Sequence, residues 1–171
     1  MRDTIGSYIT AGFVLIFCIA ALIIILSRNY LDKMNFRLER TWKKNDDIFR
    51  QWANVAAEIA GLAPEAVDPG TMDTVRAFLN AKKGWEKSQY AQQLFDQTKG
   101  LKDYETEDSY LAELMAEKAD FEFEAWDFVS YHNTMARHLN SRLDRKIGGF
   151  VGKLFRFKPY VRLNFVADEE K

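Results

Sequence analysis

The first constraint on this chain is an uninterrupted apolar run near its N-terminus. Residues 9–26 (ITAGFVLIFCIAALIIIL) contain no charged side chain, and with Tyr8 and Ser27 they make up the roughly 20 residues that a helix needs to cross a bilayer. A cleaved signal peptide has a shorter apolar core, about 7 to 15 residues, followed by a small-residue cleavage site. This run ends instead at Ser27-Arg28-Asn29-Tyr30. We therefore predict a retained transmembrane helix.

The basic residues that flank this run predict its orientation. Only Arg2 precedes it, whereas the segment after it carries Arg28, Lys33, Arg37, Arg40, Lys43 and Lys44. Loops that remain in the cytoplasm are the ones enriched in Lys and Arg. The sequence thus predicts a single-pass protein with its N-terminus outside and its remaining residues in the cytoplasm.

Beyond the span, apolar residues recur at helical spacing in three segments. The first predicts one helix from the membrane to Gly61, with a heptad seam typical of coiled coils at Leu31, Met34, Leu38, Trp42, Phe49, Trp52, Val55 and Ile59. We predict a second helix from near Thr71 to near Lys99-Gly100, which Lys82-Lys83-Gly84 can break. The third predicted helix extends from about Thr106 to Lys146.

Three apolar stripes cannot all stay exposed, so the sequence predicts an all-α fold. We expect a single N-terminal transmembrane helix continuous with a long-helix antiparallel bundle. Three helices lie outside the membrane, or four if the second one breaks. The expected division is residues 1–27 for the short N-terminus and transmembrane helix and 28–146 for the bundle. Residues 147–171 form a Gly/Phe/Lys-rich C-terminal segment with an acidic, loose end at residues 168–171.

The residue types argue against catalysis. Cys18 is the only cysteine, which excludes an internal disulfide and a cysteine-rich zinc site. His132 and His138 are the only histidines, and their spacing places them about 240° apart around a helix, too far to share a metal. A hydrogen-bonded core histidine is expected at 132, with a ligand or a proton switch as the alternative. The net charge of -1 disfavours nucleic acid. We predict no enzymatic activity and no cofactor or metal.

Two groups of residues match a known family. Near the membrane they are Asn29, Leu31, Trp42 and Asp46, and at the end of the third helix they are Asn133 and Asn140, followed by Leu154-Phe155-Arg156-Phe157-Lys158-Pro159. The chain resembles the LemA family, as a divergent member. It departs from the family pattern at residues 51–57 (QWANVAA), where the family has paired arginines and Ile-Pro-Asn, and at His132, where it has Tyr.

The resemblance to the LemA family implies a cellular location and a fold rather than a catalysed reaction. Members are bacterial proteins in which an N-terminal transmembrane helix leads into a long-helix bundle, and one branch is linked to building magnetosome membranes. The family has no established catalytic residues. The resemblance therefore implies a bacterial cytoplasmic (inner) membrane protein.

Two complementary charge stripes suggest contacts between copies of the chain. Carboxylates recur along the third helix at Glu113, Glu117, Asp120, Glu124 and Asp127, and cations recur along the first at Lys33, Arg37, Arg40 and Lys44. With three helices the third one starts near the membrane, so the two stripes lie at a similar level. We predict that they pair head to tail between protomers. The alternatives are solvated faces, attraction of the cations to anionic lipid and a metal site on the carboxylates.

The C-terminal segment mixes aromatic and basic side chains. Those of interest are Phe150, Lys153, Leu154, Phe155, Arg156, Phe157 and Lys158. They either cap the open end of the bundle or contact a membrane or partner. Three helices outside the bilayer would leave this segment far from its own membrane, whereas four would bring it back.

These features together predict a function without catalysis. We expect a membrane-anchored scaffold or assembly protein that forms homo-oligomers and contacts lipid or other membrane proteins. The alternative is an adaptor that regulates a single membrane enzyme or protease.

Overall fold

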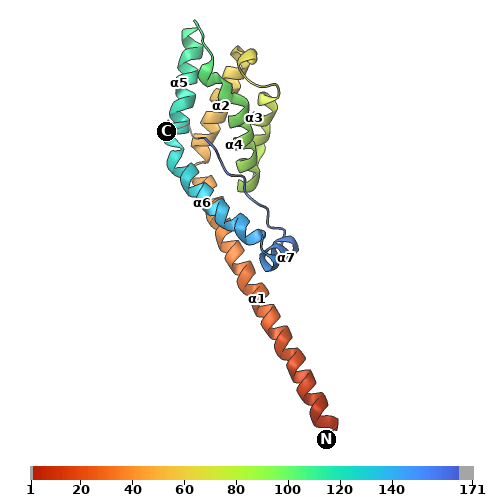
Figure 1. The fold of residues 1–171 in the computed structure, drawn as a ribbon. Coiled ribbons are helices and arrows are strands. Elements are labelled where there is room, and N and C mark those ends of the chain that lie inside the picture. Colours follow the sequence, from red (N-terminus) through yellow and green to blue (C-terminus); the bar gives the residue numbers. More distant parts are fainter. Residues whose placement is uncertain (1, 166–171) are drawn as a thin grey trace.

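The computed structural model describes residues 2–165, and all regular structure in that range is helical (Figure 1). The α-helices of this range are α1 (Arg2–Lys44), α2 (Asp46–Leu62), α3 (Thr71–Asn80), α4 (Gly84–Thr98), α5 (Ser109–Glu124), α6 (Trp126–Leu143) and α7 (Lys146–Leu154). The predicted all-α class is therefore confirmed. The acidic end at residues 168–171 lies outside the described residues.

The first part of α1 is an exposed apolar rod. Its side chains from residue 11 to residue 26 are exposed or half-buried around the whole helix, among them Phe13, Phe17, Ile19, Leu22 and Leu26. This helix is long and apolar enough to cross a membrane. Cys18 is exposed on it.

The second part of α1 enters the bundle without a break. Leu31, Met34, Leu38 and Trp42 follow the 3,4 spacing of one helix face, and all four are buried. The helix therefore carries an exposed apolar surface at one end and a core seam at the other. The predicted continuity of the apolar segment with the bundle is present up to Lys44.

The prediction of one helix as far as Gly61 is wrong at Asn45. Its backbone, at φ -106° and ψ 12°, lies outside the helical region, and its side chain donates to the carbonyl of Thr41 at 2.8 Å. Asparagine competes with helical backbone bonds in this way. The ladder nevertheless resumes, since the amide of Phe49 donates to the carbonyl of Asn45. The joint between α1 and α2 is therefore a bend rather than a loop.

The predicted second helix is broken at residues 81–83, where α3 turns back into α4. Ala81 and Lys83 are both extended, and α4 starts at Gly84, whose amide donates to Glu39 Oε2 at 2.9 Å. A Cβ at Gly84 would lie 2.8 Å from Trp42 Cδ1, so only glycine allows this close approach. The chain thus runs along the bundle in four passes, α1–α2, α3, α4 and α5–α6, instead of three.

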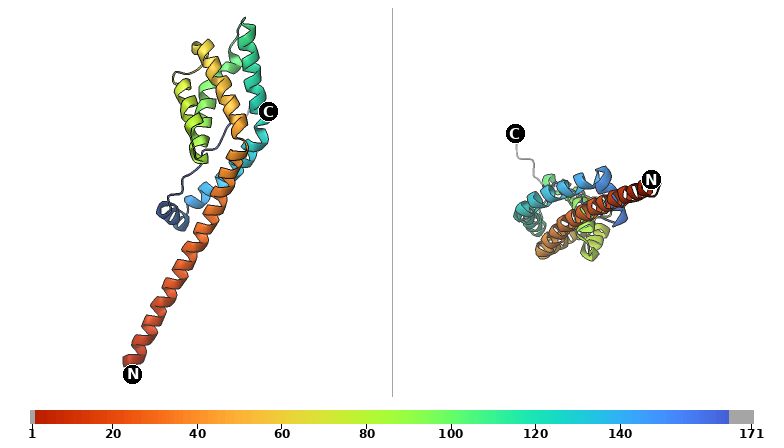
Figure 2. Two further views of the ribbon diagram at one scale, coloured as in Figure 1. Left: turned by 180° about the vertical axis from the view of Figure 1, so that it is seen from behind. Right: turned by 90° about the horizontal axis from the view of Figure 1, so that it is seen from below.

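The predicted third helix is also divided. It starts at Ser109, after Asp108 caps the amides of Tyr110 and Leu111, and it bends at Ala125 between α5 and α6. Because of the extra turn after α3, α5 starts at the end of the bundle far from the apolar segment. It packs along α2, whereas α6 and α7 pack along α1 (Figures 1 and 2). The expectation that the third helix starts near the membrane is therefore wrong.

Aromatic rings fill the centre of the bundle. Trp42 is 1% exposed, and its ring centroid lies 5.0 Å from that of Phe49, 4.8 Å from Phe128 and 5.5 Å from His132. Such pairs add to the apolar burial of each ring. The core therefore joins α1, α2 and α6 at the level of the α1–α2 bend.

Candidate functional site

The last described residues form an element that we call the C-terminal strap, residues 157–165. It leaves α7 and returns along the bundle (Figure 1), with Tyr160, Leu163 and Phe165 buried. Phe157 is half-buried and Lys158 is exposed. The tail therefore contributes to the core, but through residues other than the predicted Phe150 and Leu154, which are exposed.

Two asparagines of α6 hold the strap. Asn140 donates to the carbonyl of Tyr160 at 2.7 Å and accepts from its amide at 3.1 Å. Asn133 makes the same pair of bonds with Leu163, both at 2.7 Å. Each side-chain amide thus satisfies one backbone donor and one acceptor, as a neighbouring β-strand would.

The spacing of these asparagines matches the strap. Seven residues of helix rise about 10.5 Å, and the three residues from Tyr160 to Leu163 span about 10 Å when extended. Asn133 and Asn140 therefore lie on one face of α6 in register with Leu163 and Tyr160 of the strap. This gives a structural reason for the pair of asparagines that the family resemblance singled out.

Tyr160 of the strap also forms a hydrogen bond through its side chain. Its hydroxyl donates to Glu39 Oε1 at 2.8 Å. Burial raises the pKa of Tyr160, and the charge of Glu39 raises it further, so the phenol stays protonated. Because Glu39 also caps Gly84, one carboxylate of α1 connects the strap and the start of α4.

His132 is fully buried beside the strap. Its Nε2 lies 2.9 Å from the carbonyl oxygen of Val161, which can only accept, so this nitrogen carries the proton. Its Nδ1 has no partner among the described residues. Burial lowers the pKa of His132 to about 4, and the bond to Val161 opposes this only partly. The predicted core histidine is thus hydrogen-bonded and neutral.

We expect the protein to lose stability as the pH falls below 6.5. The unfolded state takes up a proton near pH 6.5, whereas the folded state resists protonation of His132 down to about pH 4. The stability is complete above pH 6.5, and the free energy of unfolding should fall by about 2 kcal/mol between pH 6.5 and 5. Urea unfolding of the full chain in mild detergent at several pH values measures this.

Two variants make that measurement specific. His132→Phe should remove most of the dependence between pH 6.5 and 5, whereas His138→Gln, at an exposed position of the same helix, should retain it. A wild-type stability that is flat over this window would contradict the assignment.

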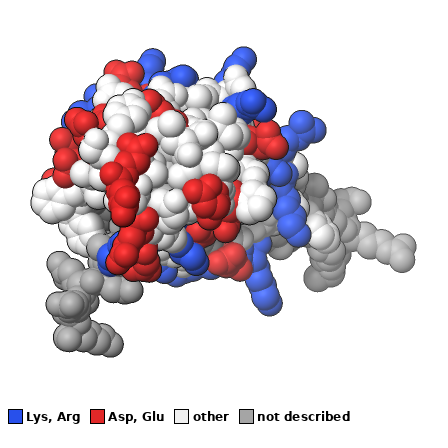
Figure 3. Space-filling view, turned by 90° about the horizontal axis from the view of Figure 1, so that it is seen from above, with Lys and Arg blue, Asp and Glu red and all other residues white. Residues whose placement is uncertain are grey.

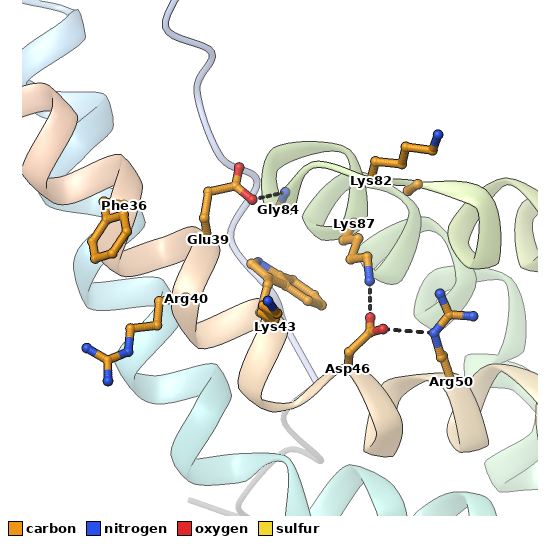
Figure 4. A pocket seen from close by; sticks show the side chains of 11 residues that line it. Phe36, Glu39, Arg40, Lys43, Asp46, Arg50, Lys82, Gly84 and Lys87 are labelled. Carbon is orange, nitrogen blue, oxygen red and sulfur yellow. Dashed lines mark hydrogen bonds and ion pairs between the residues drawn. The ribbon is translucent and has the colours of Figure 1, made fainter.

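A second polar site is a pocket of about 700 Å³ between α1, the start of α2 and the α3–α4 turn (Figure 4). Asp46 accepts hydrogen bonds from Lys87 and Arg50. Burial raises the pKa of Asp46, but these two bonds outweigh it, and the net pKa is lowered. The ion pairs therefore join the α1–α2 bend to α4.

The chemistry available in this pocket is limited. Its two carboxylates, Glu39 and Asp46, are already hydrogen-bonded, and neither histidine nor cysteine is among its described lining residues. Within residues that the structure describes, no group of three or more His, Cys, Asp or Glu side chains could hold a metal ion. The pocket is best explained as a structural joint, and the absence of enzymatic activity stays a prediction.

The predicted charge stripes are exposed but lie at different levels. Lys33, Arg37, Arg40 and Lys44 are exposed on α1, and Glu113, Glu117, Asp120, Glu124 and Asp127 are exposed on α5 and the start of α6. In α5, Glu122 reaches Trp52, which lies eight residues beyond Lys44. Glu113, Glu117 and Asp120 therefore lie roughly 12 Å or more beyond Lys44 along the bundle. Asp127 lies nearer its level, because the adjacent Phe128 packs against Trp42. The level predicted for the acidic stripe is therefore wrong for most of its residues, because α5 starts at the far end, while its pairing with the basic stripe of another copy stays a prediction.

The remaining candidate site lies where α7 meets α1. Phe155 lies under the guanidinium of Arg28, 4.4 Å from its ring centroid, and Ile24 packs against the core. The helix α7 therefore sits beside the last turns of the apolar segment. Its exposed apolar side chains are Ile147, Phe150 and Leu154, and the exposed cations of this region are Arg142, Arg145, Lys146, Lys153, Arg156 and Lys158.

The sequence predicted the composition of α7 and left its position open between three and four helices outside the membrane. Four passes return the chain to the end of the apolar segment, as the sequence predicted for a break at Gly84. Of the other residues matched to the family, Leu31 and Trp42 are buried, Asp46 is ion-paired and Asn29 is exposed. Comparisons with protein-family models, curated proteins and solved structures found no match to this chain.

Proposed function

We propose that this protein is a single-pass membrane scaffold whose helical bundle is held against one face of the bilayer. The observation that carries the proposal is the continuity of α1. The helix passes from an exposed apolar rod into the bundle core without a break. An exposed apolar surface of this length is stable only in lipid or against another protein. A helix shared between bilayer and core fixes the bundle relative to the membrane.

The placement of α7 supports the same orientation. Its apolar side chains and surrounding cations are typical of a helix that lies in the lipid interface. Residues 142–158 carry six Lys and Arg against one Asp, and this cationic region lies beside the end of the apolar segment. By the positive-inside rule, the bundle lies in the cytoplasm. The LemA-like residues support a bacterial inner membrane.

The far end of the bundle has the opposite charge. Residues 101–124 carry nine Asp and Glu against two Lys, and Figure 3, which views that end, shows acidic side chains grouped across it. Such an end is repelled by anionic lipid. It is therefore available to partner proteins in the cytoplasm.

An exposed aromatic pair partway along the bundle, at the bend between α5 and α6, supports contact with proteins. Phe123 is 82% exposed and Trp126 is 46% exposed, three residues apart around the bend at Ala125. Large exposed aromatic side chains are enriched among residues that dominate protein interfaces. We propose that the bundle presents this pair to a second copy or to another membrane protein.

Labelling with a membrane-impermeant maleimide tests the anchoring. The native Cys18 should stay unlabelled in intact vesicles of either orientation, because the bilayer covers it. A Ser109→Cys variant, at the start of α5, should react only when the cytoplasmic face is exposed. Labelling of Cys18 in intact vesicles would overturn the span, and labelling of Ser109→Cys from outside would overturn the orientation.

Mass photometry of the detergent-solubilised full chain tests the scaffold. We expect oligomers that Phe123→Ser with Trp126→Ser dissociates and that Phe36→Ser, at an exposed position of α1, leaves intact. A monomer purified with one stoichiometric foreign protein would favour the adaptor instead.

A further inference from the structure

A cavity of about 510 Å³ lies between α1 and the corner where α6 turns into α7. One wall is α1 from Leu26 to Leu31, and the other contains Arg142, Arg145 and Lys146, followed by Ile147. Three cations therefore face an apolar helix across a space large enough for a small polar group.

The described lining of this cavity carries positive charge only. None of the described residues that line it is a carboxylate. No ion pair within the described part of the chain involves Arg142, Arg145 or Lys146. The guanidinium of Arg142 is held 4.7 Å from the ring centroid of Tyr30, so one of the three cations is already positioned. An anion is the ligand that complements this lining.

The cavity lies at the level where lipid phosphates occur. Leu26 is the last residue of the uncharged run, and Ser27 and Arg28 begin the polar part of α1. The stacking of Arg28 on Phe155 fixes α7 at the same level. A lipid whose phosphate occupied the cavity would therefore extend its acyl chains along Leu26 and Ile147 into the bilayer.

We propose that this cavity binds the phosphate headgroup of an anionic phospholipid. The inference rests on the proposed crossing of the membrane by α1, and it adds a specific ligand to it. Arginine forks bind phosphate oxygens in pairs, and basic pockets beside membrane-spanning helices suit anionic headgroups. The bound lipid bridges α1 and the α6–α7 corner, and so holds the bundle at a defined tilt to the bilayer.

Native mass spectrometry of the delipidated full chain, titrated with phosphatidylglycerol or phosphatidylcholine, tests this. The variant with Arg142→Gln, Arg145→Gln and Lys146→Gln should bind phosphatidylglycerol about tenfold more weakly or worse. The matched control, with Lys153→Gln, Arg156→Gln and Lys158→Gln, loses the same charge outside the cavity and should change the affinity less than about threefold. Equal losses would overturn the site in favour of a diffuse surface attraction.

Further variants and ligands distinguish the proposed lipid site from the alternatives. Ser27→Phe fills the cavity without changing its charge, and it should weaken binding even if the triple variant folds poorly. Phosphatidylcholine that binds as tightly as phosphatidylglycerol would overturn the charge selectivity. Displacement of the lipid by millimolar inorganic phosphate would show a free-phosphate site instead. Maleimide labelling of Cys18 reports the membrane span separately, so the lipid site and the anchor can fail independently.

Discussion

Replacing Asn140 by leucine is expected to lower the free energy of unfolding by about 2–4 kcal/mol. Leucine has a similar size but cannot bond to the backbone of Tyr160, whose amide and carbonyl both depend on Asn140. Leaving a buried donor and a buried acceptor without partners costs about 1–3 kcal/mol each. The partial exposure of Asn140 reduces this, because water can reach part of the site.

The measurement is urea unfolding of the full chain in mild detergent, followed by the fluorescence of buried Trp42 and Trp52. Limited proteolysis should also cut the strap of the Asn140→Leu variant before that of the wild type. Asn54→Leu is the matched control, because Asn54 is exposed on α2 and makes no side-chain hydrogen bond within the described residues. If both variants unfold at the same urea concentration, the strap does not stabilise the bundle through Asn140.

Replacing Gly148 by alanine is expected to detach α7 from the end of α6. A Cβ at this position would lie 1.9 Å from the backbone oxygen of Arg142, far inside contact distance, and a backbone atom cannot rotate away as a side chain can. Overpacking costs of 1–3 kcal/mol are usual even where side chains can adjust. We expect backbone amides of α7 to exchange roughly a hundredfold faster, which corresponds to about 3 kcal/mol.

Hydrogen exchange of the full chain in detergent, read out by peptide, measures this effect. Gly61→Ala provides the control, because a Cβ there meets nothing within 4 Å. Alanine in place of a helical glycine should leave the stability unchanged or raise it by up to about 1 kcal/mol. Unchanged exchange of α7 in Gly148→Ala would contradict the geometry of the α6–α7 corner.

The local pattern of the sequence predicts most of the helical content. The 3,4 spacing of Leu31, Leu38 and Trp42 correctly places the core seam of α1, because helical periodicity is a local property. Helical periodicity does not determine whether a helix continues through residues that disfavour it. Asn45 bends the rod through its own side chain, and the 81–83 turn depends on the packing of Gly84 against Trp42. These contacts are tertiary, so the number of passes stays open from sequence alone.

For the candidate sites too, the sequence predicts the local composition but not the position in the fold. The mixture of aromatic and basic residues in α7 is visible in the sequence, but its distance from the apolar segment follows from the number of passes. The strap was missed because its segment has no helical period. Its available signals are Pro159, which disfavours a helix, and the alternation of Leu163 and Phe165. The level of the charge stripes was mispredicted for a related reason, since an extra turn moves the start of α5 to the other end.

The position of the strap has a consequence for biosynthesis. The apolar segment leaves the ribosome before the bundle does, while the strap is still unmade. Residues 157–165 emerge after the seven α-helices of the described range, yet Tyr160 bonds to Glu39 of α1 and fills the centre of the bundle. A nascent chain that stops before residue 157 would have an open core. The fold closes only once the strap has been made, so copies terminated before it would be marked for proteolysis by their exposed interior.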